Sequence, residues 1–168
     1  MSRQDELALL KDVEDSAAGP LSVSPFVPCA PQRIPYILQA ARLTASDVLW
    51  DLGCGDGAVL VAAAQRCGCR CVGLDIDAEC LAAARRRAAK ANVAELCTWR
   101  QGDLLALPLG TLAKEPRATA ALCFLTAHGL KRLAPWLHKE WQAMRLRLIT
   151  CVESLDSAMD FTQPDVGT

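Results

Sequence analysis

The stretch at 48–57, VLWDLGCGDG, is the part of the sequence best suited to hold a ligand. It contains an apolar run, one acid, and three glycines at every second position, namely Gly53, Gly55 and Gly57. Glycine lets backbone N–H groups approach a ligand where a side chain would collide, and the N-terminus of the helix expected at 58–66 favours negative charge. The pattern predicts a strand, a tight turn and a helix that together bind a nucleotide. The same glycines also satisfy the dinucleotide pattern G-x-G-x-x-A, so the loop alone does not select the ligand.

Three carboxylates distinguish S-adenosylmethionine from NAD as the ligand. Asp51 ends the first strand, where an acid would face the phosphates of NAD but suits the ammonium group of S-adenosylmethionine. Asp75, followed by Ile76, ends the next strand about 20 residues past the glycines, which is the reach required for ribose hydroxyls in either ligand. Asp103 follows a third strand and can accept a hydrogen bond from an adenine amino group, while Leu104 can cover the ring. Together the acids favour S-adenosylmethionine.

The motifs DLGCGDG, GLDID and QGDLL, with their spacing, resemble those of the class I, Rossmann-like S-adenosylmethionine-dependent methyltransferases over about 25–155. Within that class, PFVPCAPQ, the DLGCGDG motif and a basic helix after the fourth strand are most similar to the lysine methyltransferases of adenine nucleotide translocase and ATP synthase c-subunit, and to their bacterial relatives. The resemblance implies S-adenosylmethionine as cofactor, S-adenosylhomocysteine as product and a protein lysine as methyl acceptor. The expected cofactor-binding residues are Phe26, Asp51, Gly53, Cys54, Gly55, Gly57, Asp75, Ile76, Asp103 and Leu104.

Phe26 belongs to this set because of the segment around it. Pro25 and Pro28 restrict the loop, and each biases the residue before it toward an extended conformation. In the subgroup that the sequence resembles, a similar segment packs over the cofactor. A simple linker is the alternative reading.

The acceptor side of the site is less clearly marked. The apolar strand expected at 119–125 delivers Thr126 and His128 to the carboxyl edge of the sheet, where ligands bind in open α/β folds. Methyltransferases that act on nucleic-acid bases or glutamine amides usually carry Asn/Asp-Pro-Pro-aromatic here, whereas this chain has Leu-Thr-Ala-His at 125–128. Thr126 and His128 are candidate catalytic residues, a capping or solvated role is the alternative for His128, and the sequence identifies no catalytic base.

Composition narrows the class of protein further. The 168 residues carry a net charge of −1, which gives no overall attraction to nucleic acid, and no apolar run approaches the length of a membrane span. Nine cysteines, an odd number, indicate a reduced protein. Cys67, Cys69 and Cys71 alternate without a C-x-x-C pair, so small buried side chains are expected rather than a metal site. The N-terminus does not look like a presequence, so we expect cytoplasm or nucleus, with mitochondria left open by the family resemblance.

The expected fold is a doubly wound, Rossmann-like α/β sandwich of three layers around a mostly parallel sheet. Residues 1–24 form an N-terminal helix, at about 4–13, and a linker; 25–155 form the cofactor-binding domain; and 156–168 form a polar tail. Strands are expected at 48–51, 70–74, 96–100, 119–125 and 146–152. Helices are expected at 32–42, 58–66, 78–91 and 129–144, the last kinked or split by Pro135.

Two departures from the relatives keep other functions open. The relatives have an arginine where this chain has Ala58, and they continue into a terminal hairpin that we expect this chain to lack. Because that hairpin completes the sheet and one wall of the substrate site, a non-catalytic or partner-dependent S-adenosylmethionine-binding protein is the second hypothesis. An NAD-dependent oxidoreductase is the third.

Overall fold

Five parallel strands form the sheet in the computed structural model, which describes residue 23 and residues 28–151. They lie in the order β3-β2-β1-β4-β5. The strands are β1 (Val48–Leu52), β2 (Arg70–Asp75), β3 (Cys97–Gln101), β4 (Ala120–Cys123) and β5 (Arg147–Thr150). The helices are α2 (Ile34–Ala41), α3 (Ala58–Cys67), α4 (Ala78–Lys90) and α5 (Ala127–Met144), with 3-10 turns η1 (Ala94–Leu96) and η2 (Leu104–Ala106).

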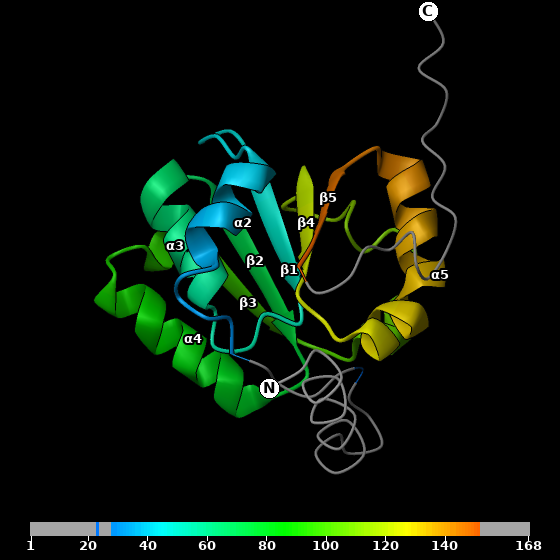
Figure 1. The fold of residues 1–168 in the computed structure, drawn as a ribbon, viewed down its shortest axis with the longest axis horizontal. Coiled ribbons are helices and arrows are strands. Elements are labelled where there is room, and N and C mark those ends of the chain that lie inside the picture. Colours follow the sequence, from blue (N-terminus) through cyan, green and yellow to red (C-terminus); the bar gives the residue numbers. More distant parts are fainter. Residues whose placement is uncertain (1–22, 24–27, 152–168) are drawn as a thin grey trace, which may run out of the picture.

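Helices cover both faces of the sheet, which confirms the three-layer, doubly wound architecture (Figure 1). Helices α2, α3 and α4 lie on one face, and α5 lies on the other. The connection between β3 and β4 runs on the α5 side and contains no helix longer than η2. Because all strands are parallel, their carboxyl ends, and the loops that follow them, meet at one edge of the sheet.

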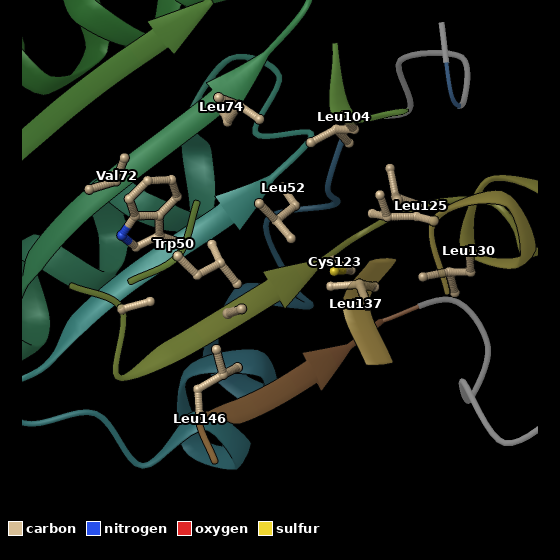
Figure 2. Close-up of a cluster of buried hydrophobic side chains, with 14 of the residues drawn as sticks. Trp50, Leu52, Val72, Leu74, Leu104, Cys123, Leu125, Leu130, Leu137 and Leu146 are labelled. Atoms are coloured by element: carbon tan, nitrogen blue, oxygen red, sulfur yellow. The ribbon is translucent and has the colours of Figure 1, made fainter. Parts of the chain in front are cut away.

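Two apolar cores lie on either side of β1, whose five residues are all buried. Val48, Trp50 and Leu52 face the core under α5, while Leu49 faces the core under α2 and α3, as the two-residue repeat of a strand requires. Figure 2 shows the first core, where Leu130 and Leu137 of α5 meet side chains from β1, β2 and β4. Burial on both faces explains why these strands are apolar almost throughout.

Helix α5 differs from the expected bounds, and it is not split into two helices at Pro135. It starts two residues earlier, with Thr126 as its N-cap, and continues without a break through Pro135 to Met144. Pro135 is on the exposed face, and its buried neighbours Leu133, Ala134 and Leu137 pack against the sheet. We attribute the continuity to this packing, because burial of one helix face outweighs the loss of a single backbone hydrogen bond. Strands β4 and β5 are shorter than expected by three residues each.

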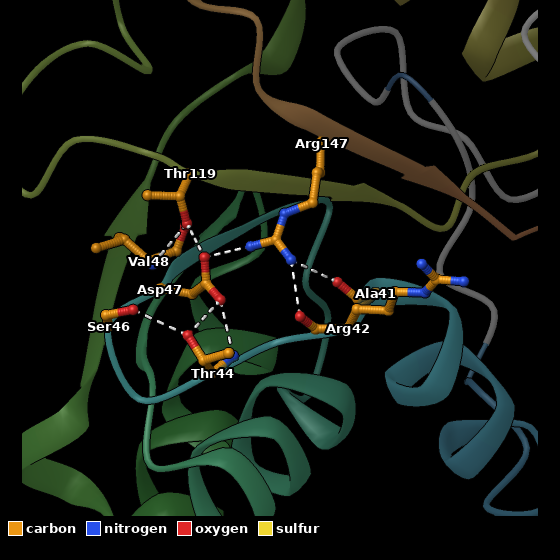
Figure 3. A network of polar contacts seen from close by, with 8 residues as sticks. All are labelled: Ala41, Arg42, Thr44, Ser46, Asp47, Val48, Thr119 and Arg147. Atoms are coloured by element: carbon orange, nitrogen blue, oxygen red, sulfur yellow. Dashed lines mark hydrogen bonds and ion pairs between the residues drawn. The ribbon is translucent and has the colours of Figure 1, made fainter.

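A polar network at the amino edge of the sheet joins three strands and one helix (Figure 3). Asp47 is 8% exposed and accepts hydrogen bonds from Thr119 (2.7 Å) and from the backbone and hydroxyl of Thr44, and it pairs with Arg147. Arg147 also donates to the carbonyls of Ala41 and Arg42 at the end of α2. Burial would raise the pKa of Asp47, but these hydrogen bonds and Arg147 outweigh it and lower the pKa. The network fixes β5 to the body of the fold.

Several expectations concern segments outside the described residues. These are the N-terminal helix at 4–13, Phe26, the tail at 156–168 and the absence of a terminal hairpin. Within the described part of the chain, no helix combines the length and apolar character needed to cross a bilayer.

Candidate functional site

The glycine loop leaves β1 at the carboxyl edge and ends in α3, as expected. Gly57 is the N-cap of α3, with φ of 71°. A Cβ on Gly57 would lie 2.5 Å from Cη2 of Trp99 and 2.8 Å from Cβ of Ala84, so no other residue fits without rearrangement. Trp99 also lies against Gly73 of β2, where an added Cβ would be 2.6 Å from the ring. The indole of Trp99, which belongs to β3, therefore packs behind the glycine loop and supports it.

The backbone N–H groups of the loop have a different role from the one that the sequence suggests. Gly53 and Cys54 both donate to the carbonyl of Leu74, at 2.9 and 3.1 Å, and Gly57 donates to Cys54. Gly55 donates to Asp75. Our expectation that these N–H groups face the ligand is wrong for those four residues, because three of them hold the loop against β2 and the N–H of Gly57 closes a turn within the loop. What the glycines provide is a backbone without side chains at the surface of the site.

Asp75 lies at the end of β2 with both carboxylate oxygens fixed by the backbone. Its Oδ2 accepts the N–H of Gly55 at 2.7 Å, and its Oδ1 accepts the N–H of Asp77 at 2.9 Å. Each oxygen retains a lone pair for a further donor. A carboxylate held in this way is preorganised to accept hydrogen bonds from vicinal hydroxyls.

Among the residues that the structure describes, Asp51 has no charged partner to balance its burial. It is 3% exposed, and none of the described residues donates a hydrogen bond to its buried Oδ1. Burial, followed by the negative charge of Asp75, raises the pKa of Asp51 to about 8. An unpaired buried carboxylate is costly unless a cation or a hydrogen-bond donor reaches it. The position therefore fits a positively charged group of a ligand.

Asp103 and Leu104 form the third part of the site, after β3. Asp103 is half-buried and accepts the N–H of Leu105 at 2.9 Å, and no described residue donates to its other oxygen. Leu104 is 5% exposed, and its Cδ1 lies 3.8 Å from the place of a Cβ on Gly53. Ile76 is half-buried beside Asp75. Asp51, Asp75 and Asp103 thus lie at the carboxyl ends of three adjacent strands, β1, β2 and β3, and the side chain of Leu104 packs against the glycine loop.

Comparison with known proteins identifies the ligand of this site. Residues 51–157 match a family model described as the ANTKMT methyltransferase domain. The chain belongs to this family. A curated protein-lysine N-methyltransferase from Saccharolobus islandicus (strain REY15A) is 27% identical over 117 residues, which are 69% of each protein.

Solved structures agree with the family. An RNA methyltransferase from Salinibacter ruber, bound to S-adenosylhomocysteine, is 34% identical, with a TM-score of 0.62 over 68% of this chain and 71% of that one. A geranyl diphosphate C-methyltransferase from Streptomyces coelicolor A3(2) shares the fold at 21% identity and a TM-score of 0.56, over 71% of this chain and 44% of its own. The protein is an S-adenosylmethionine-dependent methyltransferase.

The residues expected on the acceptor side of this methyltransferase lie at the first turn of α5. Thr126 is 8% exposed, and its hydroxyl accepts the N–H of Gly129 at 3.2 Å, so it caps the helix. His128 is exposed in the first turn. Both lie at the carboxyl edge, as expected. Phe26, expected to cover the cofactor, lies outside the described residues.

Cys54 is placed differently from the other candidate residues of the methyltransferase loop. Its sulfur points into the fold and lies 2.7 Å from the place of a Cβ on Gly73. Burial is the main reason that the pKa of this thiol is raised, so it stays protonated. Its side chain therefore packs behind the loop, and only its backbone borders the site.

Two contacts that hold the site were missed in the sequence. Arg87 of α4 pairs with the carboxylate of Asp56 and donates through Nε to its carbonyl at 3.1 Å, which ties the glycine loop to α4. Glu140 of α5 is 2% exposed and accepts the N–H groups of Gly110 and Leu112, which holds the β3–β4 connection beside α5. The sequence, with three consecutive arginines at 85–87, did not indicate which of them would pair with the glycine loop.

Cysteines form a second cluster away from the cofactor edge. The sulfur atoms of Cys69 and Cys71 are 3.9 Å apart, and Cys97 pairs with Cys71 in the sheet register. In the part of the chain that the structure describes, no group of three or more His, Cys, Asp or Glu residues is arranged to hold a metal ion. Cys69 and Cys71 are both buried in the core under α3, where they pack as small apolar side chains.

Proposed function

We propose that this methyltransferase transfers the methyl group of S-adenosylmethionine to the side-chain amine of a lysine in a protein substrate. The observation that carries the proposal is the match of 51–157 to the ANTKMT methyltransferase domain. The curated lysine methyltransferase from Saccharolobus islandicus supports the same substrate class.

The three acids would hold three different parts of the cofactor. Asp51 supplies the carboxylate for the methionine ammonium group, since its buried Oδ1 lacks a donor among the described residues. Asp75 accepts the ribose hydroxyls with oxygens that Gly55 and Asp77 already orient. Asp103 accepts the adenine amino group, and Leu104 and Ile76 provide apolar contact with the ring. Gly53, Gly55 and Gly57 keep side chains away from the ligand.

The chain contributes mainly orientation and exclusion of water. When bound, the cofactor supplies an activated methyl group that a neutral amine can accept. The protein must therefore receive the lysine at the carboxyl edge, near the start of α5, in its uncharged form. Thr126 borders this edge as a helix cap, and His128 is exposed next to it, where it can orient a substrate group.

Methylation of RNA is the alternative acceptor, favoured by the name of the relative from Salinibacter ruber. The residues at 125–128 argue against transfer to a base amino group, because Leu-Thr-Ala-His replaces the Asn/Asp-Pro-Pro-aromatic segment of enzymes that do this. A lysine acceptor therefore remains the better proposal.

The test is transfer of a tritiated methyl group from S-adenosylmethionine into a cell extract by the full 168-residue chain. Label that is lost on protease treatment, retained after ribonuclease and recovered as methyllysine would support the proposal. Label in ribonuclease-sensitive material would overturn it in favour of RNA. The control is Asp75→Ala, which should weaken S-adenosylhomocysteine binding by about 1.5–3 kcal/mol, the scale of lost hydrogen bonds to a charged group.

A further inference from the structure

Glu140 is a buried acid that does not border the cofactor. It lies in the second half of α5, is 2% exposed, and forms no ion pair with any Lys or Arg among the described residues. Its two oxygens instead accept one backbone N–H each, Oε1 from Gly110 and Oε2 from Leu112, the latter at 3.1 Å. A carboxylate offers two acceptor oxygens at a fixed spacing, so it can hold two N–H groups of one turn at once. Burying the charge is costly, and these hydrogen bonds offset the cost.

Trp136 holds the same segment one helical turn earlier. Its Nε1 donates to the carbonyl of Pro108 at 3.4 Å, and the hydroxyl of Thr111 donates to the same carbonyl at 2.6 Å. Trp136 and Glu140 are four residues apart, which places them on one flank of α5. Residues 108–112 are therefore fixed along that flank of the helix.

The connection held in this way begins with Asp103 and Leu104, which directly follow β3. Just before them, the N–H of Gly102 donates to the carbonyl of Asp75 at 2.9 Å, which ties the chain to β2. Leu104 is buried in the core under α5. In the described part of the chain, the next hydrogen bonds from the connection to another element are those of residues 108–112 with α5. Asp103 therefore lies between an attachment to β2 and an attachment to α5.

The geometry of Asp103 depends on both attachments. Its Oδ1 accepts the N–H of Leu105 at 2.9 Å, within the turn η2, and η2 contacts α5. Hydrogen bonds weaken steeply when their geometry is lost, so the other oxygen of Asp103 can select an amino group only while this turn stays in place. Release of Gly110 and Leu112 would free the connection behind η2 and allow the turn to shift along the helix.

We propose that Glu140 is a positioning residue for cofactor recognition. It holds the β3–β4 connection so that Asp103 meets the adenine amino group, and it thereby contributes to the selection of adenine over bases that lack this group. The proposal rests on the proposed function, in which Asp103 accepts the adenine amino group.

The test compares two ligands by calorimetry with the full chain. They are S-adenosylhomocysteine and S-inosylhomocysteine, in which a carbonyl oxygen replaces the adenine amino group, and the measured quantity is the ratio of their Kd values. Glu140→Gln keeps the size of the side chain but turns an amide NH₂ toward one of the two N–H groups. Trp136→Phe, which removes the hydrogen bond to Pro108, is a milder second variant. Glu115→Gln is the matched control, because it removes the same charge from an exposed position in the same connection.

The unaltered protein should bind S-adenosylhomocysteine roughly tenfold or more tightly than the inosine analogue, because the analogue turns an oxygen toward Asp103. Glu140→Gln should lower this preference about fivefold by raising the Kd of S-adenosylhomocysteine alone. Trp136→Phe should lower it less, and Glu115→Gln should leave it unchanged. Melting temperatures identify the variants that fold. An unchanged preference in the folded α5 variants, or equal weakening of both ligands, would overturn the positioning role.

Asp103→Ala separates this role from the adenine placement on which it rests. It should abolish most of the preference, and adding Glu140→Gln should then change little, because both substitutions act on one contact. A preference that survives Asp103→Ala would contradict the placement of adenine and the positioning role together. A preference that responds to Asp103→Ala but not to the α5 variants would overturn the positioning role alone.

Discussion

Asp51 is a buried acid whose ionisation should be linked to cofactor binding. In the free protein, burial and then Asp75 raise its pKa to about 8. The cofactor ammonium group requires the ionised carboxylate, so S-adenosylhomocysteine affinity should increase as pH rises from about 6 to 8 and then level off. Calorimetry in buffers of different ionisation enthalpy should detect proton release at neutral pH. Asp51→Asn should remove both the pH dependence and the release; an unchanged pH profile in this variant would assign the effect to another group.

The same group affects the stability of the free protein. A carboxyl group with a raised pKa in the folded state contributes stability that is present below its unfolded pKa, about 4, and is lost as pH rises through its folded pKa. The contribution of Asp51 to the free energy of unfolding should therefore decrease as pH rises from about 4 to about 8. Bound S-adenosylhomocysteine should restore it.

A substitution at Gly57 can show whether the packing of Trp99 behind the loop matters for cofactor binding. Gly57→Ala introduces a Cβ at 2.5 Å from Trp99 and demands a left-handed conformation. We expect a loss of about 2–3 kcal/mol in unfolding free energy together with weaker S-adenosylhomocysteine binding. Urea unfolding and calorimetry provide the two values. Gly110→Ala is the control, because Gly110 also has a positive φ but its Cβ would enter open space; an equal loss in both would assign the effect to backbone strain alone.

At the scale of elements, Asp47 organises the amino edge of the sheet. Asp47→Ala should lower the unfolding free energy by about 2–4 kcal/mol, because Thr119, Thr44 and Arg147 lose a shared acceptor. Since the pKa of Asp47 is lowered in the folded state, its contribution is present at neutral pH and is lost as pH falls below about 4. Urea titrations at neutral and acidic pH check both statements. Arg85→Gln, an exposed change on α4, should alter stability little, and a comparable loss there would contradict the role of the network.

Elements with a clear local pattern were predictable from the sequence, and contacts between them were not. Alternating or continuous apolar residues predicted all five strands of the described sheet, and Asp51, Asp75 and Asp103 could be placed because each follows such a strand. The supports from Trp99, Arg87 and Glu140 join segments roughly 30 residues or more apart in the sequence. Their partners are set by the packing of α4 and α5 on the sheet, which no local pattern reports.

At the scale of the whole molecule, Val23 attaches the N-terminal segment to the core. Val23 is 8% exposed within the core under α5, so a deletion that reaches it would disturb packing as well as any contact of Phe26. Phe26→Ala is the sharper change. If the ring of Phe26 lies near the cofactor sulfonium, this substitution should weaken S-adenosylmethionine binding by roughly 0.5–2 kcal/mol. Binding of S-adenosylhomocysteine, whose sulfur is uncharged, should be weakened less. Calorimetry with both ligands measures this; equal or absent effects would leave the segment as a linker.

Trp99 also gives the molecule a natural optical reporter. Its indole lies against Gly57 and Gly73, directly behind the loop that borders the cofactor. The other three tryptophans, Trp50, Trp136 and Trp141, belong to the core under α5 or its margin. The fluorescence of Trp99 should therefore change when the cofactor binds at the loop, whereas the fluorescence of the other three tryptophans should stay constant. Trp99→Phe should abolish this change and leave the constant fluorescence in place.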